Sequence, residues 1–211
     1  MAESPNKAER DWKRETREWM KALLPALAIV LVIRMFFFTP AVVSGSSMEP
    51  NLSDGERVIV NKVVYSTRAP ERGEVIVFHA DDNKDYIKRV IAVPGDRIMV
   101  RQDEVYINGS LIAEPYIQEQ VEAARRSGTS YNRLKNFRVT EFGIEPATVP
   151  EGHYFVMGDN RSNSTDSRDP QIGFVPEHRI VGRVEYVFWP LPDIRRVRHP
   201  AVQIAHSEVT P

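Results

Sequence analysis

The segment Tyr86-Ile87-Lys88-Arg89-Val90-Ile91-Ala92-Val93, followed by Pro94-Gly95-Asp96, is the clearest strand in the sequence. Its β-branched residues predict an extended conformation, and the Pro-Gly-Asp sequence predicts the turn that ends it. A period of two places Lys88 on one face with Tyr86, Val90 and Ala92, and Arg89 on the opposite face. Lysine is usually a surface residue, so an apolar face around Lys88 indicates either an ordinary exposed side chain beside Arg89 or a functional one.

Several other short β-branched runs lie between turn signals. The predicted strands cover residues 57–60, 63–65, 74–79, 86–93, 97–101, 105–107, 154–157 and 180–188. Asn108-Gly109 predicts a tight hairpin. No long amphipathic helix intervenes and no repeat has a fixed period, so we expect a mainly β fold with one antiparallel sheet domain. Residues 115–150 are polar and weakly periodic, which predicts a variable excursion of loop with a short helix or hairpin.

Residues 20–38 form the longest apolar run of the chain. As a helix they would span about 28 Å, close to the thickness of a bilayer core, so we predict a single transmembrane anchor. Lys21 and Arg34 lie near its two ends, where long cationic side chains can reach the head groups. A cleaved signal peptide is the alternative, but no small-x-small cleavage site follows directly.

The basic residues before the anchor set its expected orientation. They are Lys7, Arg10, Lys13, Arg14, Arg17 and Lys21. They place residues 1–19 in the cytoplasm and a β-rich domain, residues 39–192, outside the cell membrane. Residues 193–211 form a polar tail that we expect to fray or to touch the membrane surface.

The composition excludes several classes of function. The chain has 211 residues and no cysteine, so neither a disulfide, nor a thiolate metal site, nor a cysteine nucleophile can form. A formal net charge of −1 gives no reason to expect a nucleic-acid partner. No residue pattern predicts a metal or a cofactor.

Ser44-Gly45-Ser46-Ser47-Met48-Glu49-Pro50 follows shortly after the apolar run and contains a candidate nucleophile, Ser47. None of the five histidines lies in a pattern that suggests a serine–histidine pair, and the G-x-S-x-G signature is absent around Ser47. Lysine can replace histidine as the base when it is neutral, which requires its pKa to fall by about 3 units, or roughly 4 kcal/mol. We therefore hypothesise that Lys88, 41 positions later, is the base for Ser47.

A second cluster, Gly158-Asp159-Asn160-Arg161-Ser162-Asn163-Ser164-Thr165-Asp166-Ser167-Arg168-Asp169, follows an apolar strand. The spacing of a calcium-binding EF-hand loop fails here, because Arg161 occupies a ligand position and the twelfth residue is not glutamate. Two interpretations are open, and both can hold together. In the first, the loop is structural, with internal ion pairs Asp159–Arg161 and Asp166–Arg168. In the second, it supports a catalytic site with a serine hydroxyl that orients Lys88.

Taken in order, these segments resemble the bacterial type I signal peptidases, which remove signal peptides with a serine and a lysine. Ser47-Met48-x-Pro50 resembles the nucleophile box, residues 86–96 the lysine box and residues 158–168 the last box. Residues 55–62 and 72–78 resemble two further boxes of the family, and the single anchor resembles its Gram-positive-like branch. The resemblance extends from the anchor to about Pro190.

The resemblance implies a role for each matching residue. Ser47 would be the nucleophile and Lys88 the general base, with Ser164 hydrogen-bonded to the lysine and Asp159, Arg161, Asp166 and Arg168 bracing the site. Some family members use a serine hydroxyl two residues before the nucleophile as an oxyanion donor, and that position is Gly45 here. Gly45 is expected to lie in the substrate-binding site together with Val43, Met48, Tyr86 and Ile87.

The resemblance also implies the substrates and surroundings. Substrates would be signal peptides of secreted preproteins with small residues, typically alanine, at the first and third positions before the cut. Partners would then be membrane lipid and, by proximity, the protein-export translocon. Two other classes stay open from the residues alone: a self-cleaving repressor-type serine–lysine protease and a non-enzymatic, membrane-tethered β module.

Overall fold

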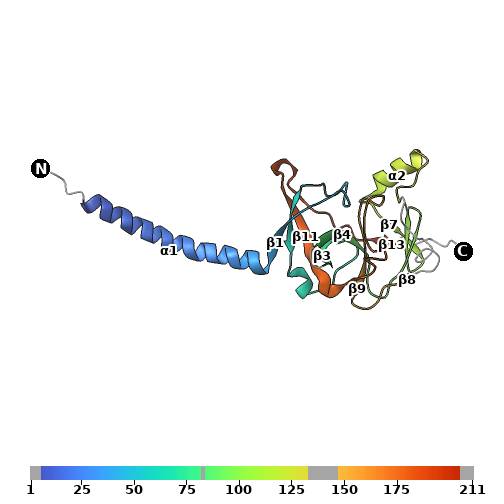
Figure 1. The fold of residues 1–211 in the computed structure, drawn as a ribbon, viewed down its shortest axis with the longest axis horizontal. Coiled ribbons are helices and arrows are strands. Elements are labelled where there is room, and N and C mark those ends of the chain that lie inside the picture. The colour runs from blue at the N-terminus through green and yellow to red at the C-terminus, as the bar shows by residue number, and fades with distance from the viewer. Residues whose placement is uncertain (1–5, 82–83, 133–146, 205–211) are drawn as a thin grey trace.

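The computed structural model describes residues 6–81, 84–132 and 147–204. Figure 1 shows a long helix, α1, that projects away from a body made of strands. The helices are α1 (Asn6–Phe36) and α2 (Gln118–Arg126), with short 3₁₀ turns at Val64–Ser66, Glu177–Arg179 and Leu191–Asp193. The strands are β1 (Phe38–Val42), β2 (Arg57–Asn61), β3 (Val75–Asp81), β4 (Lys84–Ala92), β5 (Arg97–Arg101), β6 (Glu104–Ile107), β7 (Ser110–Ala113), β8 (Ala147–Thr148), β9 (His153–Met157), β10 (Val175–Pro176), β11 (Ile180–Trp189), β12 (Arg195–Arg196) and β13 (Gln203–Ile204).

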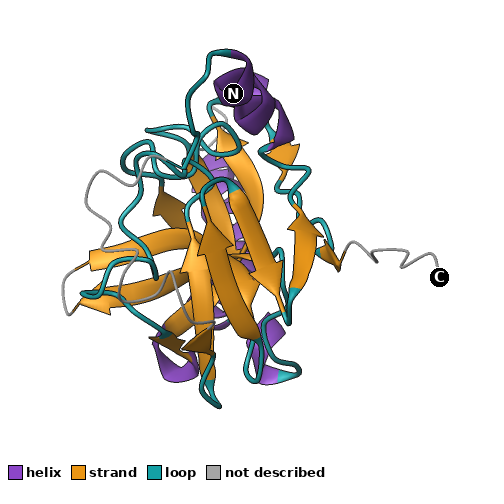
Figure 2. Cartoon of the chain, turned by 90° about the vertical axis from the view of Figure 1, so that its right-hand side faces the viewer, coloured by secondary structure: helices purple, strands orange, loops and turns teal. Residues whose placement is uncertain are grey.

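Two antiparallel sheets make up the body, so the mainly β prediction is confirmed (Figure 2). The larger sheet has the order β1-β2-β11-β3-β4-β9-β10, with β12 attached to β11. The smaller sheet has the order β13-β7-β6-β5-β8. The predicted hairpin joins β6 to β7, where Asn108 and Gly109 have φ angles of 53° and 83°. Two successive positive φ angles fit a tight turn whose twist matches that of the strands.

Strand β4 is buried on both faces from Lys88 to Ala92. One apolar cluster contains Ile91 and Ala92, and another contains Val90. Because both faces of this strand are covered, none of these side chains points into solvent. Alternate side chains point instead into two different buried environments. Arg89 is consequently buried, and the polar group that binds it must come from the protein itself.

Helix α1 is longer than the anchor predicted at residues 20–38, because it begins at Asn6 and ends at Phe36. Between Leu23 and Leu31 its apolar side chains are exposed, with relative exposures of 56–60%. No helix among the described residues meets the combined length and hydropathy criteria for crossing a bilayer.

Three local predictions differ from the structure. Residues 63–65 were expected to be a strand, but Val64–Ser66 form a 3₁₀ turn, and Asn61 Oδ1 accepts a hydrogen bond from Val63 N–H at 3.1 Å. Residues 193–211 were expected to fray or to touch the membrane surface, whereas β12 and β13 within them pair with β11 and β7, and residues 205–211 lie outside the described residues. The anchor was predicted to extend to residue 38, but α1 ends at Phe36 and Phe38 is the first residue of β1. The excursion contains α2, and residues 133–146 of it lie outside the described residues.

Candidate active site

An open pocket of about 490 Å³ lies where the end of β1, the start of β4 and the loop after β9 meet. The loop after β1 supplies Val43, Gly45, Ser47 and Met48 to its wall, and β4 supplies Tyr86, Ile87 and Lys88. The loop after β9 supplies Arg161, Ser164 and Arg168. The structure therefore gathers ten of the twelve predicted site residues around one pocket, and Asp159 and Asp166 lie buried behind it.

Lys88 and Ser47 are in direct contact in this pocket. Lys88 Nζ donates hydrogen bonds to Ser47 Oγ at 2.8 Å and to the carbonyl oxygen of Ile87 at 3.0 Å. The lysine side chain also packs over the ring of Tyr86, with Nζ 5.1 Å from the ring centroid. The contact places an amine within proton-transfer distance of a hydroxyl.

Burial lowers the pKa of Lys88 to about 8, because an ammonium loses its hydration there. Asp166 and Asp159 act in the opposite direction, since their negative charges favour the ammonium, whereas Arg168 adds to the lowering. Lys88 is only 3% exposed. With a pKa of about 8, roughly a tenth of the lysines are neutral at pH 7.

A turn before Ser47 sets the path of the nucleophile loop. Gly45 has a φ angle of 84°, in the left-handed region that favours glycine, and its N–H donates to Asp54 Oδ1 at 2.7 Å. Val43 and Met48, on either side of this turn, belong to the hydrophobic core. The loop is thus fixed at both ends by packing and in the middle by Asp54.

The loop after β9 is hydrogen-bonded to the nucleophile loop. Asn160 N–H donates to the carbonyl oxygen of Ser47 at 3.0 Å, and Asn160 Nδ2 donates to the carbonyl oxygen of Ser46 at 3.1 Å. Gly158 lies so close that a Cβ atom there would be 2.4 Å from Ser47 O and 2.3 Å from Ser164 Oγ. Only glycine permits this approach of the two loops.

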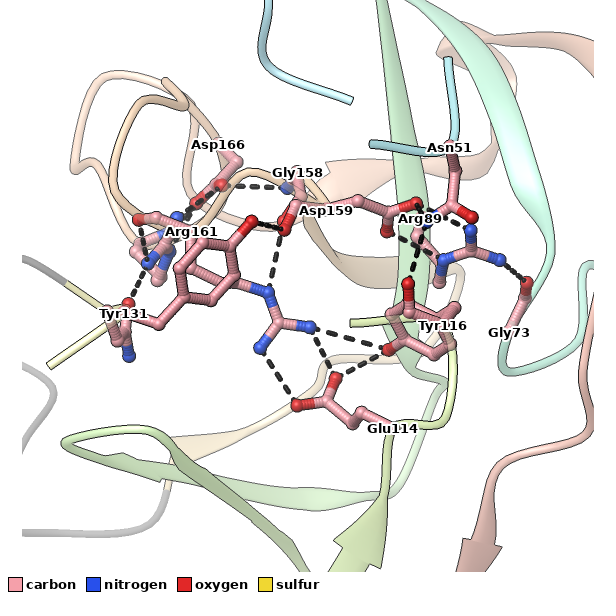
Figure 3. A network of polar contacts seen from close by, with 12 residues as sticks. Asn51, Gly73, Arg89, Glu114, Tyr116, Tyr131, Gly158, Asp159, Arg161 and Asp166 are labelled. Carbon is pink, nitrogen blue, oxygen red and sulfur yellow. Dashed lines mark hydrogen bonds and ion pairs between the residues drawn. The ribbon is translucent and has the colours of Figure 1, made fainter. Parts of the chain in front are cut away.

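The ion pairs behind the pocket differ in part from those predicted (Figure 3). Asp159 pairs with Arg89 and not with Arg161, through Nε–Oδ1 and Nη2–Oδ2 contacts of 2.8 and 2.6 Å. Arg161 instead forms a two-pronged pair with Glu114 and donates from Nε to the carbonyl oxygen of Gly158 at 3.0 Å. Acidic and basic side chains that are close in a loop need not pair with each other when a buried partner elsewhere in the fold allows a two-pronged contact.

Asp166 and Arg168 form the ion pair that the sequence predicted. Arg168 donates from Nε and Nη2 to the two carboxylate oxygens, each at 2.8 Å. Burial by itself would raise the pKa of Asp166, but Arg168 and the N–H of Gly158 hold it below its ordinary value. Asp166 is therefore an anion that braces the start of the loop.

The hydrogen bond from Lys88 to Ser164 that the resemblance implies is not formed. Ser164 Oγ is buried and meets no partner with hydrogen-bond geometry in the described part of the chain, although its hydroxyl helps to lower the pKa of the Asp166 carboxyl. The donor contacts of Lys88 go to Ser47 and to its neighbour's carbonyl instead. Ser164 nevertheless lines the same pocket as Lys88.

Sequence reasoning missed the residues that hold this loop from outside. Asn51 Nδ2 donates to Asp159 Oδ2 at 2.9 Å, and Tyr131 donates its hydroxyl proton to Asp159 O at 2.9 Å. The ring of Tyr116 stacks on Arg89, with 4.0 Å between the guanidinium carbon and the ring centroid. The position of Arg89 inside an apolar strand was the one feature of the sequence that could have indicated this arrangement. A buried arginine requires an acidic partner, and Arg89 therefore predicts one.

Comparison with known proteins identifies the family. The profile described as "Signal peptidase, peptidase S26" matches residues 16–189. "Signal peptidase I" of Bacillus amyloliquefaciens is 43% identical, over 90% of this chain and 96% of that protein. "Signal peptidase I T" of Bacillus subtilis (strain 168) is 40% identical, over 94% and 100%.

Two further relatives have similar names. "Signal peptidase IB" of Staphylococcus aureus (strain COL) is 39% identical over 89% of this chain and 97% of that protein. A crystal structure of a signal peptidase I from Enterococcus faecalis V583 has 34% identity and a TM-score of 0.43, and covers 55% of this chain and 97% of that chain. The family profile and the relatives at about 40% identity, taken over most of the chain, show that it belongs to the signal peptidase family, peptidase S26, and is an enzyme of that family.

Proposed function

We propose that this enzyme is an endopeptidase that cleaves signal peptides from exported preproteins, with Ser47 as nucleophile and Lys88 as general base. The observation that carries the proposal is the 2.8 Å contact between Lys88 Nζ and Ser47 Oγ in a buried setting that lowers the lysine pKa. No metal or cofactor has a role in it.

The reaction is acyl transfer. Neutral Lys88 takes the proton of Ser47 Oγ, and the oxygen attacks the scissile carbonyl carbon to give a tetrahedral oxyanion. The oxyanion collapses to an ester on Ser47 as the peptide C–N bond breaks, and the lysine ammonium gives its proton to the leaving amine. Neutral again, Lys88 removes a proton from water, whose oxygen attacks the ester carbonyl carbon. The bond from that carbon to Ser47 Oγ then breaks, and the lysine ammonium returns its proton to Oγ, which restores both residues.

The backbone N–H of Ser47 is the proposed donor to the oxyanion. It makes no hydrogen bond among the described residues, and is thus available. The N–H of Gly45 is already engaged by Asp54, and glycine has no hydroxyl to offer. Preorganised donors of this kind stabilise the charge that develops in the transition state.

An open strand edge supports extended binding of the substrate. Strand β4 pairs with β9 only from Arg89 onward. Among the described residues, 84–88 therefore have no strand partner on the β9 side, and residues 85–88 line the pocket. A peptide that adds to this edge would point alternate side chains toward the same wall. That wall contains the apolar side chains of Val43 and Met48, and contact with them is the proposed basis for a preference for small apolar side chains such as alanine.

We further propose that residues 20–36 of α1 anchor the enzyme in the cell membrane, with residues 1–19 in the cytoplasm and the β domain outside. The exposed apolar side chains of α1 support this, because lipid would cover surface that water otherwise meets. An anchor would concentrate the enzyme beside membrane-held preproteins, close to the lipid and to the export translocon.

Cleavage of a preprotein by the purified full-length enzyme in detergent tests the chemistry. The parent should cleave after small residues, and Ser47→Ala and Lys88→Ala should each abolish cleavage. Lys21→Ala, at an exposed lysine of α1 whose ion pair with Glu18 is also exposed, is the control and should cleave like the parent in detergent. Cleavage that survives in Ser47→Ala or Lys88→Ala would reject the serine–lysine mechanism, and an inactive parent would favour a non-enzymatic tethered module.

Carbonate extraction of membranes tests the anchor separately. The double variant Leu27→Lys, Ile29→Lys should move from the membrane pellet to the supernatant, because two central charges oppose insertion. Arg14→Lys, before the anchor, should stay in the pellet. A parent that is itself extracted by carbonate would rule out the anchor without affecting the proposed chemistry.

A further inference from the structure

The segment from Arg195 to Ile204 joins the two sheets. Strand β12 pairs with β11 of the larger sheet, and β13 pairs with β7 of the smaller one. Between them Val197 donates its N–H to Glu185 O at 2.9 Å and belongs to the hydrophobic core. This segment lies after the residues that the family profile matches, 16–189.

The middle of this segment contacts the strand that carries Lys88. Arg89 Nη1 donates to the carbonyl oxygens of Arg198 and Gly73, at 3.1 and 2.7 Å. Gly73, which precedes β3, touches the segment so closely that a Cβ atom there would lie 2.0 Å from Pro200 O. The remaining nitrogens of Arg89 bind Asp159, so the segment completes the set of partners of a buried guanidinium.

His199 attaches the same segment to strand β3. Val75 N–H donates to His199 Nδ1 at 3.1 Å, and Val75 is the residue of β3 that lies opposite Arg89 of β4. An accepting Nδ1 requires the neutral ring with its proton on Nε2. Burial, reinforced by Arg183 and Arg89, lowers the pKa of His199 to about 4, so the ring stays neutral near pH 7.

We propose that His199 is a positioning residue for the reaction. It locks the segment 195–204 onto β3 opposite Arg89, and thereby holds the Arg89–Asp159 pair that joins β4 to the loop after β9. That loop binds Ser47 O through Asn160 N–H, while Lys88 directly precedes Arg89 in β4. Both members of the Ser47–Lys88 contact are thus tied to a segment that, among the described residues, makes no hydrogen bond to either of them. The inference rests on the proposed function.

Replacement of His199 in the full-length enzyme tests this role. His199→Leu removes the acceptor for Val75 N–H and should lower kcat about 10- to 100-fold, the cost of a small misplacement of reacting groups, with little change in KM. His199→Asn puts an amide oxygen near the position of Nδ1 and should restore most of the parental kcat, whereas His199→Gln should not. His178→Leu, at an exposed histidine, is the control and should match the parent.

The pH profile separates positioning from a general loss of stability. A loosened site lets water reach Lys88, so in His199→Leu the midpoint of the rise in kcat/KM should move to higher pH. Rates are compared per folded molecule, using the folded fraction from thermal unfolding. Parental kcat and pH midpoint in His199→Leu would overturn the proposal. If that variant does not fold, equal kcat in His199→Asn and His199→Gln would overturn it, and an inactive parent would refute the proposed function instead.

Discussion

Arg89 and Asp159 form a buried ion pair, although 70 positions separate them in the chain. Their side chains are 1% and 0% exposed. Arg89 directly follows Lys88, and Asp159 directly precedes Asn160, which binds the carbonyl of Ser47. Burial disfavours the charge of the guanidinium, but Asp159 outweighs this, so the pKa of Arg89 is raised. The pair therefore links the two pieces of chain that must meet for Lys88 to reach Ser47.

Asp159→Asn should destabilise the protein by about 3–5 kcal/mol, because it leaves a buried arginine without its counter-charge. The double variant Arg89→Met, Asp159→Leu removes both charges and should recover much of that loss. Urea unfolding measures both effects, with Asp193→Asn as an exposed control. A loss for Asp159→Asn no larger than that of the control would show that the pair does not support the fold.

The rate of cleavage should rise with pH through a midpoint near 8. Lys88 acts as a base only when neutral, and its neutral fraction increases as the pH passes its pKa of about 8. Values of kcat/KM for a soluble peptide substrate between pH 6 and 10 give the midpoint. A flat profile over this range would contradict a titrating lysine base.

Lys88→Met should abolish cleavage and at the same time stabilise the fold near neutral pH. The pKa of Lys88 is about 8 when folded and near 10.5 when unfolded, so the unfolded chain binds more protons between these values. The lysine therefore costs stability that is regained only as the pH rises from about 8 toward 10.5. At pH 7 the penalty is at most about 3 kcal/mol.

Thermal or urea unfolding at pH 7 and pH 10 measures this effect. The advantage of Lys88→Met over the parent should be larger at pH 7 than at pH 10. An equal difference at both values would mean that Lys88 titrates alike in the folded and unfolded chains.

Gly158→Ala should reduce both stability and activity, because the new Cβ would collide with Ser47 O and Ser164 Oγ. Gly182→Ala is a matched control, since its Cβ would lie 2.3 Å from Asn61 O, and Gly182 is not among the residues that line the pocket. Both variants should unfold at lower urea concentration than the parent. Only Gly158→Ala should also have a lower kcat per folded molecule. Equal kcat values in the two variants would show that Gly158 does not support the active site.

Much of the fold was readable from the sequence because strand signals are local. Strand β5 was predicted with its observed limits, and the Asn108-Gly109 turn was confirmed, since two residues suffice to set its backbone. The tail was misjudged because β12 and β13 are only two residues long each. Strands this short are stable only when they pair with an existing sheet, and two residues are too few to show an alternating pattern in the sequence.

The sequence predicted the residues whose own chemistry marks them as catalytic, but it did not predict ion pairs between residues far apart in the chain. Ser47 and Lys88 were chosen by elimination of histidine bases, and the structure places them in contact. The pairs of Asp159 and Arg161 were assigned to each other because they are neighbours in sequence. Their true partners, Arg89 and Glu114, lie 70 and 47 positions away, and only the folded sheets bring them together.

Glu114→Gln should show that the end of β7, just before the excursion, supports the site. Arg161 is buried between Glu114 and the carbonyl of Gly158, so loss of the carboxylate charge leaves it unpaired and should cost about 3–5 kcal/mol. Tyr131→Phe removes one hydroxyl bond to Asp159 O and should cost only about 1 kcal/mol. Glu119→Gln, exposed in the first turn of α2, should be neutral in the same urea titration. If Glu114→Gln costs no more than Glu119→Gln, then Arg161 does not depend on Glu114, and the end of β7 does not brace the loop that holds Ser47.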